Sequence, residues 1–285
     1  MNNKVILGTV QFGLNYGINN KTGQPSVSDI VKMLDYAKKK GIIAIDTADA
    51  YGTASKIIGE YFQMNPNSFF VNTKFKKSDV PIRIQLEQSI KNLNIEKVNT
   101  YFFHNFNDFL LYPELIEELE ELKKDGFINK IGISIYDNEQ LKESIGCESI
   151  DTIQLPFNIL DNYNQRGGLL EDAKFKGKEI QTRSIFLQGL FFIAPTELPI
   201  KLLPLKKYLD RIIDISVHYN IPIEKLAIQY VINQPFVDHV VIGVDNLTQL
   251  EKNVDYAKES LLVEVFQELN DITVTETELL YPKNW

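Results

Sequence analysis

The chain has 285 residues, of which 44% are hydrophobic and 24% are charged, as in an ordinary globular protein. The formal net charge of −8 and the pI near 5.1 argue against a nucleic-acid-binding surface, because no block of Lys and Arg offsets the acidic balance. A single cysteine, Cys147, excludes an intramolecular disulfide and any multi-cysteine metal site.

Eight short apolar runs alternate along the chain with longer amphipathic segments. We predict strands over 5–9, 42–46, 69–74, 99–104, 130–134, 152–155, 179–183 and 239–243. The runs read as continuously apolar, which is expected of parallel strands that are buried on both faces. Eight strands close a parallel barrel, and about 250 residues suffice for one. The sequence therefore predicts an α/β fold, a single (β/α)8 TIM barrel that forms one domain over residues 1–285.

The segments between the strands carry the helical period. We predict helices over 28–40, 81–93, 113–124, 201–219 and 223–233. Gly41 and Gly126 follow the helices over 28–40 and 113–124 and would end them. Pro81 suits the first position of the helix over 81–93. Pro222 separates the last two helices.

Two connections are unusually long for this kind of fold. Residues 11–26 are rich in Gly and Asn, whereas residues 184–199 are apolar. Long loops at the catalytic face of a barrel are usually functional. The apolar side chains of 184–199 either line a pocket and close over a cofactor, or form a small satellite core.

Four polar residues lie at or just beyond the ends of predicted strands: Asp46, Tyr51, Lys74 and His104. The carboxyl ends of such strands converge on one mouth of the barrel. A phenol, an ammonium, a carboxylate and an imidazole brought together there suggest a proton donor of tuned acidity and point to carbonyl chemistry.

Each of the four residues also has a structural reading. Asp46 would cap a turn or helix, Tyr51 would be one of many packing tyrosines, Lys74 would be solvated, and His104 would be a hydrogen-bonded structural imidazole. Their order and their positions at strand ends favour the active site.

The chain resembles the aldo-keto reductases, barrel enzymes that reduce carbonyl groups with a nicotinamide cofactor. The resemblance rests on LGTVQFGLNYG, IDTADAYG, Lys74, His104, IGIS and VIGVDNLTQLEKN, and it covers nearly the whole chain. It implies that Tyr51 gives a proton to the substrate oxygen. Lys74 would lower the pKa of this phenol, Asp46 would hold Lys74, and His104 would orient the carbonyl.

The resemblance also implies a set of cofactor contacts. Gly8 and Thr9 would lie beside the nicotinamide, Ser134 and Gln154 would bind its carboxamide, and Arg183, followed by Ser184, takes the place of an aromatic stacking residue. Ile135 replaces an Asn of the family pattern. Gly243, Gln249 and Asn253 would lie at the adenosine end.

The adenosine end bears on the choice of cofactor. No Lys or Arg occupies position 243, 244 or 249, where NADP-preferring members carry cations, and Asp245 is nearby. The helix start near 247 would then hold the phosphate. Family prevalence predicts NADP (as NADPH), favoured only modestly, with NAD as the alternative.

The expected function is reduction of an aldehyde or ketone, and the motif LGTVQFGLNYG suggests a sugar or keto-sugar. One alternative is a cofactor-binding regulatory or sensor barrel with little turnover, and another is a barrel hydrolase or isomerase. The three histidines lack metal-ligand spacing, so no metal is expected.

The expected partner is a small-molecule carbonyl substrate, with no nucleic acid and no membrane. The N-terminal MNNKVILGT does not read as a signal peptide, and no stretch approaches the roughly 18 apolar residues that a membrane helix needs. We expect a cytoplasmic monomer or weak dimer.

Overall fold

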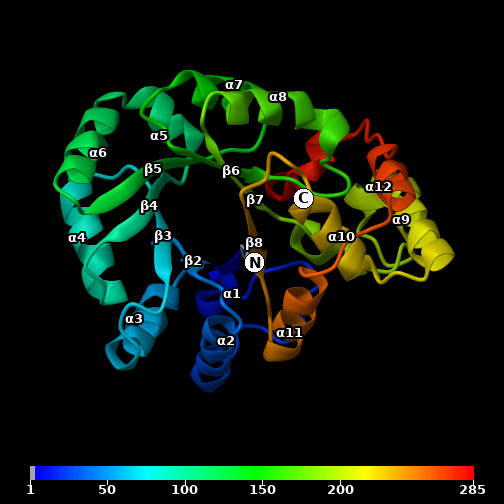
Figure 1. Ribbon diagram of the computed structural model, residues 1–285, viewed down its shortest axis with the longest axis horizontal. Coiled ribbons are helices and arrows are strands. Elements are labelled where there is room, and N and C mark those ends of the chain that lie inside the picture. Colours follow the sequence, from blue (N-terminus) through cyan, green and yellow to red (C-terminus); the bar gives the residue numbers. More distant parts are fainter. Residues whose placement is uncertain (1–3) are drawn as a thin grey trace.

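The computed structural model describes residues 4–285 and contains one closed barrel of parallel strands. Each strand pairs with the next along the chain, and the last strand pairs with the first (Figure 1). The strands are β1 (Val5–Gly8), β2 (Ala44–Asp46), β3 (Phe70–Phe75), β4 (Val98–Phe103), β5 (Ile128–Ser134), β6 (Thr152–Pro156), β7 (Glu179–Arg183) and β8 (His239–Gly243). The predicted eight-stranded α/β barrel is confirmed.

The helices surround the barrel (Figure 1). The α-helices are α1 (Val10–Gly13), α2 (Val27–Lys39), α3 (Ala54–Met64), α4 (Ile82–Leu93), α5 (Phe106–Leu111), α6 (Glu114–Lys124), α7 (Asn138–Gly146), α8 (Tyr163–Phe175), α9 (Lys206–Tyr219), α10 (Ile223–Ile232), α11 (Leu247–Tyr256) and α12 (Val263–Asn270). Four 3-10 segments complete the set: η1 (Leu187–Phe192), η2 (Ile200–Leu205), η3 (Thr277–Leu280) and η4 (Pro282–Asn284).

The predicted helix over 201–219 begins later than expected. Residues Ile200–Leu205 form the tighter 3-10 segment η2, and the α-helix starts only at Lys206. Pro204 lies inside η2 and has no backbone N–H to donate to an α-helical ladder. The proline therefore accounts for the late start of α9.

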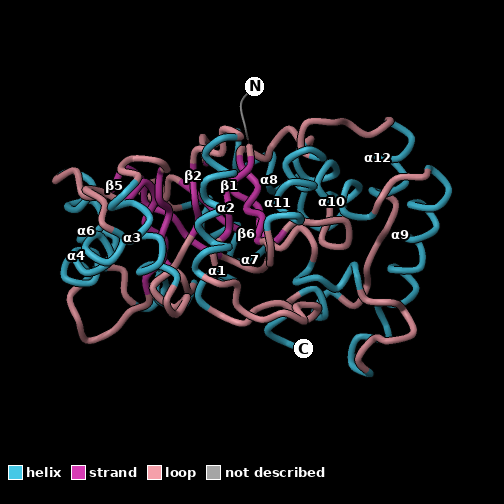
Figure 2. The backbone as a smooth tube through the Cα atoms, turned by 90° about the horizontal axis from the view of Figure 1, so that it is seen from below, coloured by secondary structure: helices cyan, strands magenta, loops and turns pink. Residues whose placement is uncertain are grey.

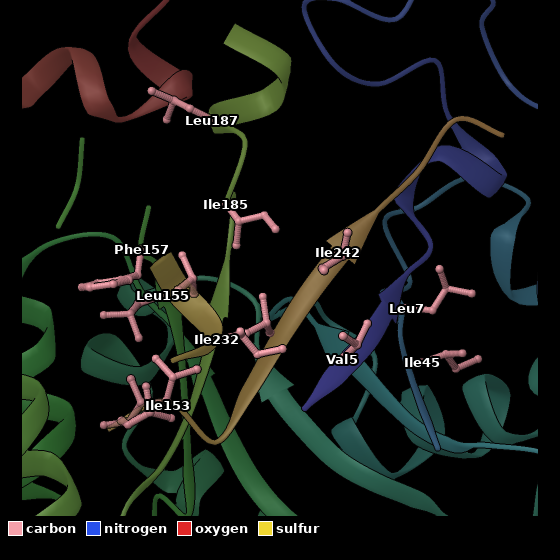
Figure 3. Packing of buried hydrophobic residues seen from close by; sticks show 14 of the residues in the cluster. Val5, Leu7, Ile45, Ile153, Leu155, Phe157, Ile185, Leu187, Ile232 and Ile242 are labelled. Carbon is pink, nitrogen blue, oxygen red and sulfur yellow. The ribbon is translucent and has the colours of Figure 1, made fainter. Parts of the chain in front are cut away.

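The larger hydrophobic cluster lies between the strands and the helices. Figure 3 shows Val5 and Leu7 of β1 and Ile242 of β8 among the buried aliphatic side chains of this cluster. Alternate residues of a strand point to opposite faces, so these side chains define the outer face of the barrel.

The inner face of the barrel is largely polar. Asn72 on β3 and Gln181 on β7 approach within 3.5 Å, and Gln154 on β6 donates a hydrogen bond of 2.8 Å to Asp46 on β2. Neither contact joins neighbouring strands, since β3 does not pair with β7 and β6 does not pair with β2, so both contacts cross the barrel interior. The expectation of strands that are apolar on both faces is wrong for the inner face, where polar side chains bond to one another.

The start of β1 and the C-terminal segment lie on opposite sides of the molecule (Figure 2). Within residues 4–285, no helix is both long and apolar enough to cross a membrane. Over the same range, no group of three or more His, Cys, Asp and Glu side chains is placed to hold a metal ion.

Replacing Gly59 with Ala should lower the free energy of unfolding by about 1–3 kcal/mol, the usual cost of overpacking. Gly59 lies on α3, and a Cβ atom there would be 2.0 Å from the backbone oxygen of Asn92 on α4. A backbone atom cannot move aside as a side chain can. Urea denaturation would measure the loss.

Gly168→Ala is the matched control, because Gly168 also lies within a helix and its added Cβ would meet nothing within 4 Å. Better helix propensity should stabilise this variant by about 0.4–1 kcal/mol. A Gly59→Ala protein as stable as the wild type would contradict the close approach of α3 and α4.

Candidate active site

A cavity of about 620 Å³ opens at the carboxyl ends of the strands, and we call it the barrel-mouth cavity. All four candidate catalytic residues line it: Asp46, Tyr51, Lys74 and His104. All the predicted cofactor-contact residues line it as well: Gly8, Thr9, Ser134, Gln154, Arg183, Ser184, Gly243, Gln249 and Asn253. The fold thus brings together residues that are spread over most of the sequence.

A buried ion pair joins two of these residues. Lys74 at the end of β3 donates to a carboxylate oxygen of Asp46 at the end of β2, and their side chains are only 1% and 4% exposed. Lys74 Nζ also donates to the Thr47 carbonyl over 3.1 Å, and Gln154 Nε2 donates to the second Asp46 oxygen. Burial lowers the pKa of the Lys74 ammonium, and the adjacent carboxylate opposes this shift. The ammonium is therefore fixed in place by an acceptor that also stabilises its charge.

Tyr51 lies in the loop between β2 and α3 and directs its ring toward this pair. Lys74 Nζ lies 5.5 Å from the centroid of the Tyr51 ring, and the His104 ring meets it edge-on at 6.0 Å. The loop packs closely on α1, since a Cβ atom on Gly13 would lie 1.8 Å from the Tyr51 carbonyl oxygen. The position of Tyr51 thus depends on a glycine that leaves room for its backbone.

The acidity of Tyr51 differs from the expectation. Burial raises the pKa of the phenol well above its usual value, the Asp46 carboxylate raises it further, and Arg183 opposes the shift. The prediction that Lys74 lowers this pKa is not met, because the ammonium is bonded to Asp46 rather than to the phenol. Tyr51 therefore carries its proton at neutral pH.

His104 follows β4 and is partly buried at the cavity wall. Burial, together with the positive charges of Lys74, Lys76 and Arg183, lowers the pKa of this imidazole to about 3. The ring is thus neutral at physiological pH and carries a single N–H. Its Nδ1 is buried without a hydrogen-bond partner among residues 4–285. A neutral imidazole can donate one hydrogen bond without adding a charge to the site.

Two buried amide oxygens lack partners at the cavity wall. Gln154 Oε1 and Gln11 Oε1 accept no hydrogen bond from any described residue. An unsatisfied buried acceptor costs free energy unless a ligand or water supplies a donor. The carboxamide of a nicotinamide carries an NH₂ group that suits Gln154, so the residues present fit this cofactor.

The Arg183 guanidinium is held by two groups from the segment that follows β5. It donates to the Ile135 carbonyl over 3.0 Å and lies 4.4 Å from the centroid of the Tyr136 ring. Ile135, which replaces the Asn of the family pattern, thus contributes its backbone oxygen instead of a side-chain amide.

The two long loops meet at the cavity. Ile18 donates its backbone N–H to the Gln188 carbonyl over 3.1 Å, and Gln188 Nε2 donates to the Tyr16 hydroxyl over 2.8 Å. Ser184, Leu187 and Gln188 all have positive φ, a conformation that costs a non-glycine residue about 1–3 kcal/mol. These contacts between the loops help to hold the strained segment in place.

The apolar loop 184–199 lines the cavity as expected, but it forms no separate satellite core. Leu187, Leu190 and Phe191 are buried in the main hydrophobic cluster, whereas Phe186 and Phe192 line the barrel-mouth cavity. The loop is therefore anchored by one set of side chains and presents another set to the cavity.

Backbone N–H groups at the start of α11 are already hydrogen-bonded to side chains of the same segment. Asn246 caps the helix by accepting from the backbone N–H of Gln249 over 2.9 Å. Gln249 in turn accepts from the Asp245 backbone N–H over 2.8 Å and donates to the Asp245 carboxylate over 3.3 Å. Two backbone donors of this helix start are already used within the protein, and a carboxylate lies beside them.

Four residues of the cavity wall were not among the site residues predicted from the sequence. Tyr16, Tyr136, Gln188 and Lys283 all line the cavity. Tyr16 lies in a loop that was expected to be functional, and burial raises its pKa to about 12. Gln188 lies in the other long loop that was expected to be functional. Tyr136 and Lys283 reach the cavity only because the folded chain brings them there.

Comparisons with known proteins agree with this geometry. A family model described as "Aldo/keto reductase family" matches residues 4–273. The uncharacterized oxidoreductase YqkF of Bacillus subtilis is 25% identical over 259 residues, which cover 82% of this chain and 84% of that protein. The NADH-specific methylglyoxal reductase of Escherichia coli is 28% identical over 54% of this chain and 55% of its own length.

A solved structure shares the fold. The holo form of an aldo-keto reductase from Bacillus halodurans superposes with a TM-score of 0.77 at 20% sequence identity. The superposition covers 96% of this chain and 94% of that one.

Lys74→Met should lower the free energy of unfolding by about 3–5 kcal/mol, because it leaves the Asp46 carboxylate buried without its ammonium. Adding Asp46→Asn should recover part of this loss by removing the unpaired charge. Chemical denaturation of the single and double variants would measure both effects.

Lys32→Met is the control, since it removes a lysine from an exposed pair in which Lys32 and Asp29 are 59% and 51% exposed. Its effect should stay below about 1 kcal/mol. Equal losses in Lys32→Met and Lys74→Met would show that the Asp46–Lys74 pair is not held in a dry environment.

Proposed function

We propose, since the chain belongs to the aldo/keto reductase family, that it reduces an aldehyde or ketone to an alcohol with a reduced nicotinamide dinucleotide. The observation that carries this proposal is the convergence of a phenol, a neutral imidazole and a buried ion pair on one cavity. The alternative of a regulatory barrel has no observation in its favour. The motif at residues 7–17 supports a sugar or keto-sugar as the carbonyl compound.

The proton in this reaction comes from Tyr51. When bound, the reduced nicotinamide would supply the hydride for the carbonyl carbon. As negative charge develops on the substrate oxygen, the Tyr51 hydroxyl donates its proton to it. A developing alkoxide is a stronger base than a phenolate, so a phenol of raised pKa still gives up its proton.

The other residues orient and stabilise the reacting groups. His104, neutral because its pKa is near 3, donates its single N–H to the same substrate oxygen. Lys74 Nζ lies 5.5 Å from the centroid of the Tyr51 ring and helps to hold this ring at the cavity wall. Asp46 keeps that ammonium in position.

We propose that NADH is preferred to NADPH, which reverses the expectation from family prevalence. The adenosine end suggested by the resemblance is lined by two carboxylates, Asp245 and Glu224, and by the mutually bonded Gln249. Neither carboxylate is paired with a cation within residues 4–285. A 2′-phosphate placed there would meet negative charge, whereas ribose hydroxyls could donate to the same oxygens.

Tyr51→Phe should reduce kcat by about 10²–10⁴, the usual contribution of a positioned general acid. The ring stays, so binding of the dinucleotide should remain within about twofold. Steady-state oxidation of NADH with an aldehyde panel, combined with fluorescence titration of the cofactor, separates the two effects.

Tyr36→Phe removes a phenolic hydroxyl from α2, outside the cavity, and serves as the control. It should leave kcat unchanged. A Tyr51→Phe enzyme that keeps more than half of the wild-type turnover would rule out Tyr51 as the proton donor.

Asp245→Asn should strengthen NADPH binding by about tenfold and leave NADH binding nearly unchanged, because it removes the carboxylate but keeps an oxygen for Gln249. Asp255→Asn makes the same charge change at the other end of α11 and should alter neither affinity. Fluorescence titration with both cofactors gives the result. A strong preference of the wild-type protein for NADPH would contradict the proposed choice of NADH.

A further inference from the structure

Two cations converge on one aromatic ring at the wall of the barrel-mouth cavity. The Arg183 guanidinium carbon lies 4.4 Å from the centroid of the Tyr136 ring, and Lys283 Nζ lies 4.8 Å from the same centroid. All three residues line the cavity. Like charges brought this close repel each other, and contact with the ring offsets only part of that repulsion.

Neither cation has an ion-pair partner in the described part of the chain. Within residues 4–285, no carboxylate forms an ion pair with Arg183 or with Lys283, whereas the third cation of the cavity, Lys74, is paired with Asp46. The remaining carboxylates of the cavity wall are Asp245, in the connection between β8 and α11, and Glu224, on α10. The cavity therefore has a basic end over β5 and β7 and an acidic end beside β8.

The C-terminal segment holds Lys283 at the cavity. Leu279 and Leu280 are buried in the main core, and Trp285 Nε1 donates to the Leu279 carbonyl over 2.8 Å. The Tyr281 ring packs edge-on against Tyr136 with centroids 6.2 Å apart. Lys283 thus extends from a segment that is docked on both sides of it.

We propose that Arg183 and Lys283 together bind an anionic group, a carboxylate or a phosphate, on the carbonyl substrate. This inference rests on the proposed function and adds the substrate class: carbonyl compounds that carry a negative charge. The guanidinium offers a planar pair of donors, and the ammonium offers a point charge, so both kinds of anion find suitable partners.

The dinucleotide pyrophosphate is a second source of negative charge, but the position of the cations favours the substrate. Arg183 ends β7 and donates to the Ile135 carbonyl just beyond β5, so its guanidinium lies at the strand ends and not beside α11. From there its charge opposes the rise in the Tyr51 pKa and adds to the fall in the His104 pKa. Lys283 shares the Tyr136 ring with Arg183, which places it at this end of the cavity and away from α11.

The test compares matched substrates that differ in charge: succinic semialdehyde against butyraldehyde, and glyceraldehyde 3-phosphate against glyceraldehyde. For the wild type, kcat/KM should be at least about tenfold higher for the charged member of each pair, and added NaCl should reduce this ratio. Lys283→Met should lower the ratio about tenfold, mainly through KM, and Lys283→Arg should retain it.

Lys56→Met is the matched control, because it removes one exposed lysine from α3 outside the cavity and should leave the ratio unchanged. A wild-type ratio near one for both pairs would overturn the proposal. So would a Lys283→Met protein that binds NADH more weakly but keeps the ratio, since the cations would then serve the pyrophosphate.

A binding measurement separates this inference from the proposed function. Calorimetric titration of the NADH-loaded protein should detect succinate but not succinamide, and Lys283→Met should abolish the succinate signal. If no carbonyl oxidises NADH but succinate still binds through Lys283, the proposed reduction fails and the anion site stands. If neither succinate nor inorganic phosphate binds while neutral aldehydes are reduced, the anion site fails alone.

Discussion

A buried charge is costly unless an opposite charge lies beside it, and Lys74 and Asp46 are almost fully removed from solvent. The two side chains must therefore stay in contact, and this contact fixes the ends of β2 and β3 at the barrel mouth. Because Asp46 is held by Lys74 and Gln154, the loop that follows β2 leaves the barrel from a fixed point and carries Tyr51 with it. Burial and the Asp46 carboxylate both raise the pKa of the Tyr51 phenol, so the phenol keeps its proton. The buried pair therefore fixes the position of the candidate acid, and its carboxylate adds to the effect of burial on the protonation state.

The same pair is one end of a polar chain that crosses the barrel. Gln154 donates to Asp46 and also, over 3.3 Å, to Gln181. Gln181 in turn donates to Glu179 over 2.9 Å. Glu179 forms an ion pair with Lys130 near the opposite rim of the barrel. A barrel interior filled with hydrogen-bonded amides demands specific partners and orientations, unlike one filled with branched aliphatic side chains. Gly132 permits this packing, since a Cβ atom there would lie 2.4 Å from the Phe102 ring beside Lys74.

Much of the fold was predictable because strand ends and helix stops are local signals. The strands over 179–183 and 239–243 begin and end as predicted, and Asp46, Lys74 and His104 meet because parallel strands align their ends. The direction of the Tyr51 pKa shift was not predictable, since it depends on burial that spacing does not reveal. The contact between Tyr136 and Lys283 was not predictable, because the two residues are 147 positions apart in sequence and only tertiary packing joins them. Gln181 did leave a signal, because β7 carries Glu, Gln, Thr and Arg beside a single apolar residue, Ile180.

The contact between the two long loops bears on how fast the cavity exchanges its contents. Ile18 and Gln188, 170 positions apart in sequence, share a backbone hydrogen bond, and a side-chain bond to Tyr16 lies beside it. These bonds form part of the cavity wall, so an elongated ligand that lies beneath them can leave only after they break. Backbone strain at Leu187 and Gln188 lowers the cost of that opening. Opening of these loops therefore precedes the release of such a ligand, a step of the kind that sets kcat in many enzymes.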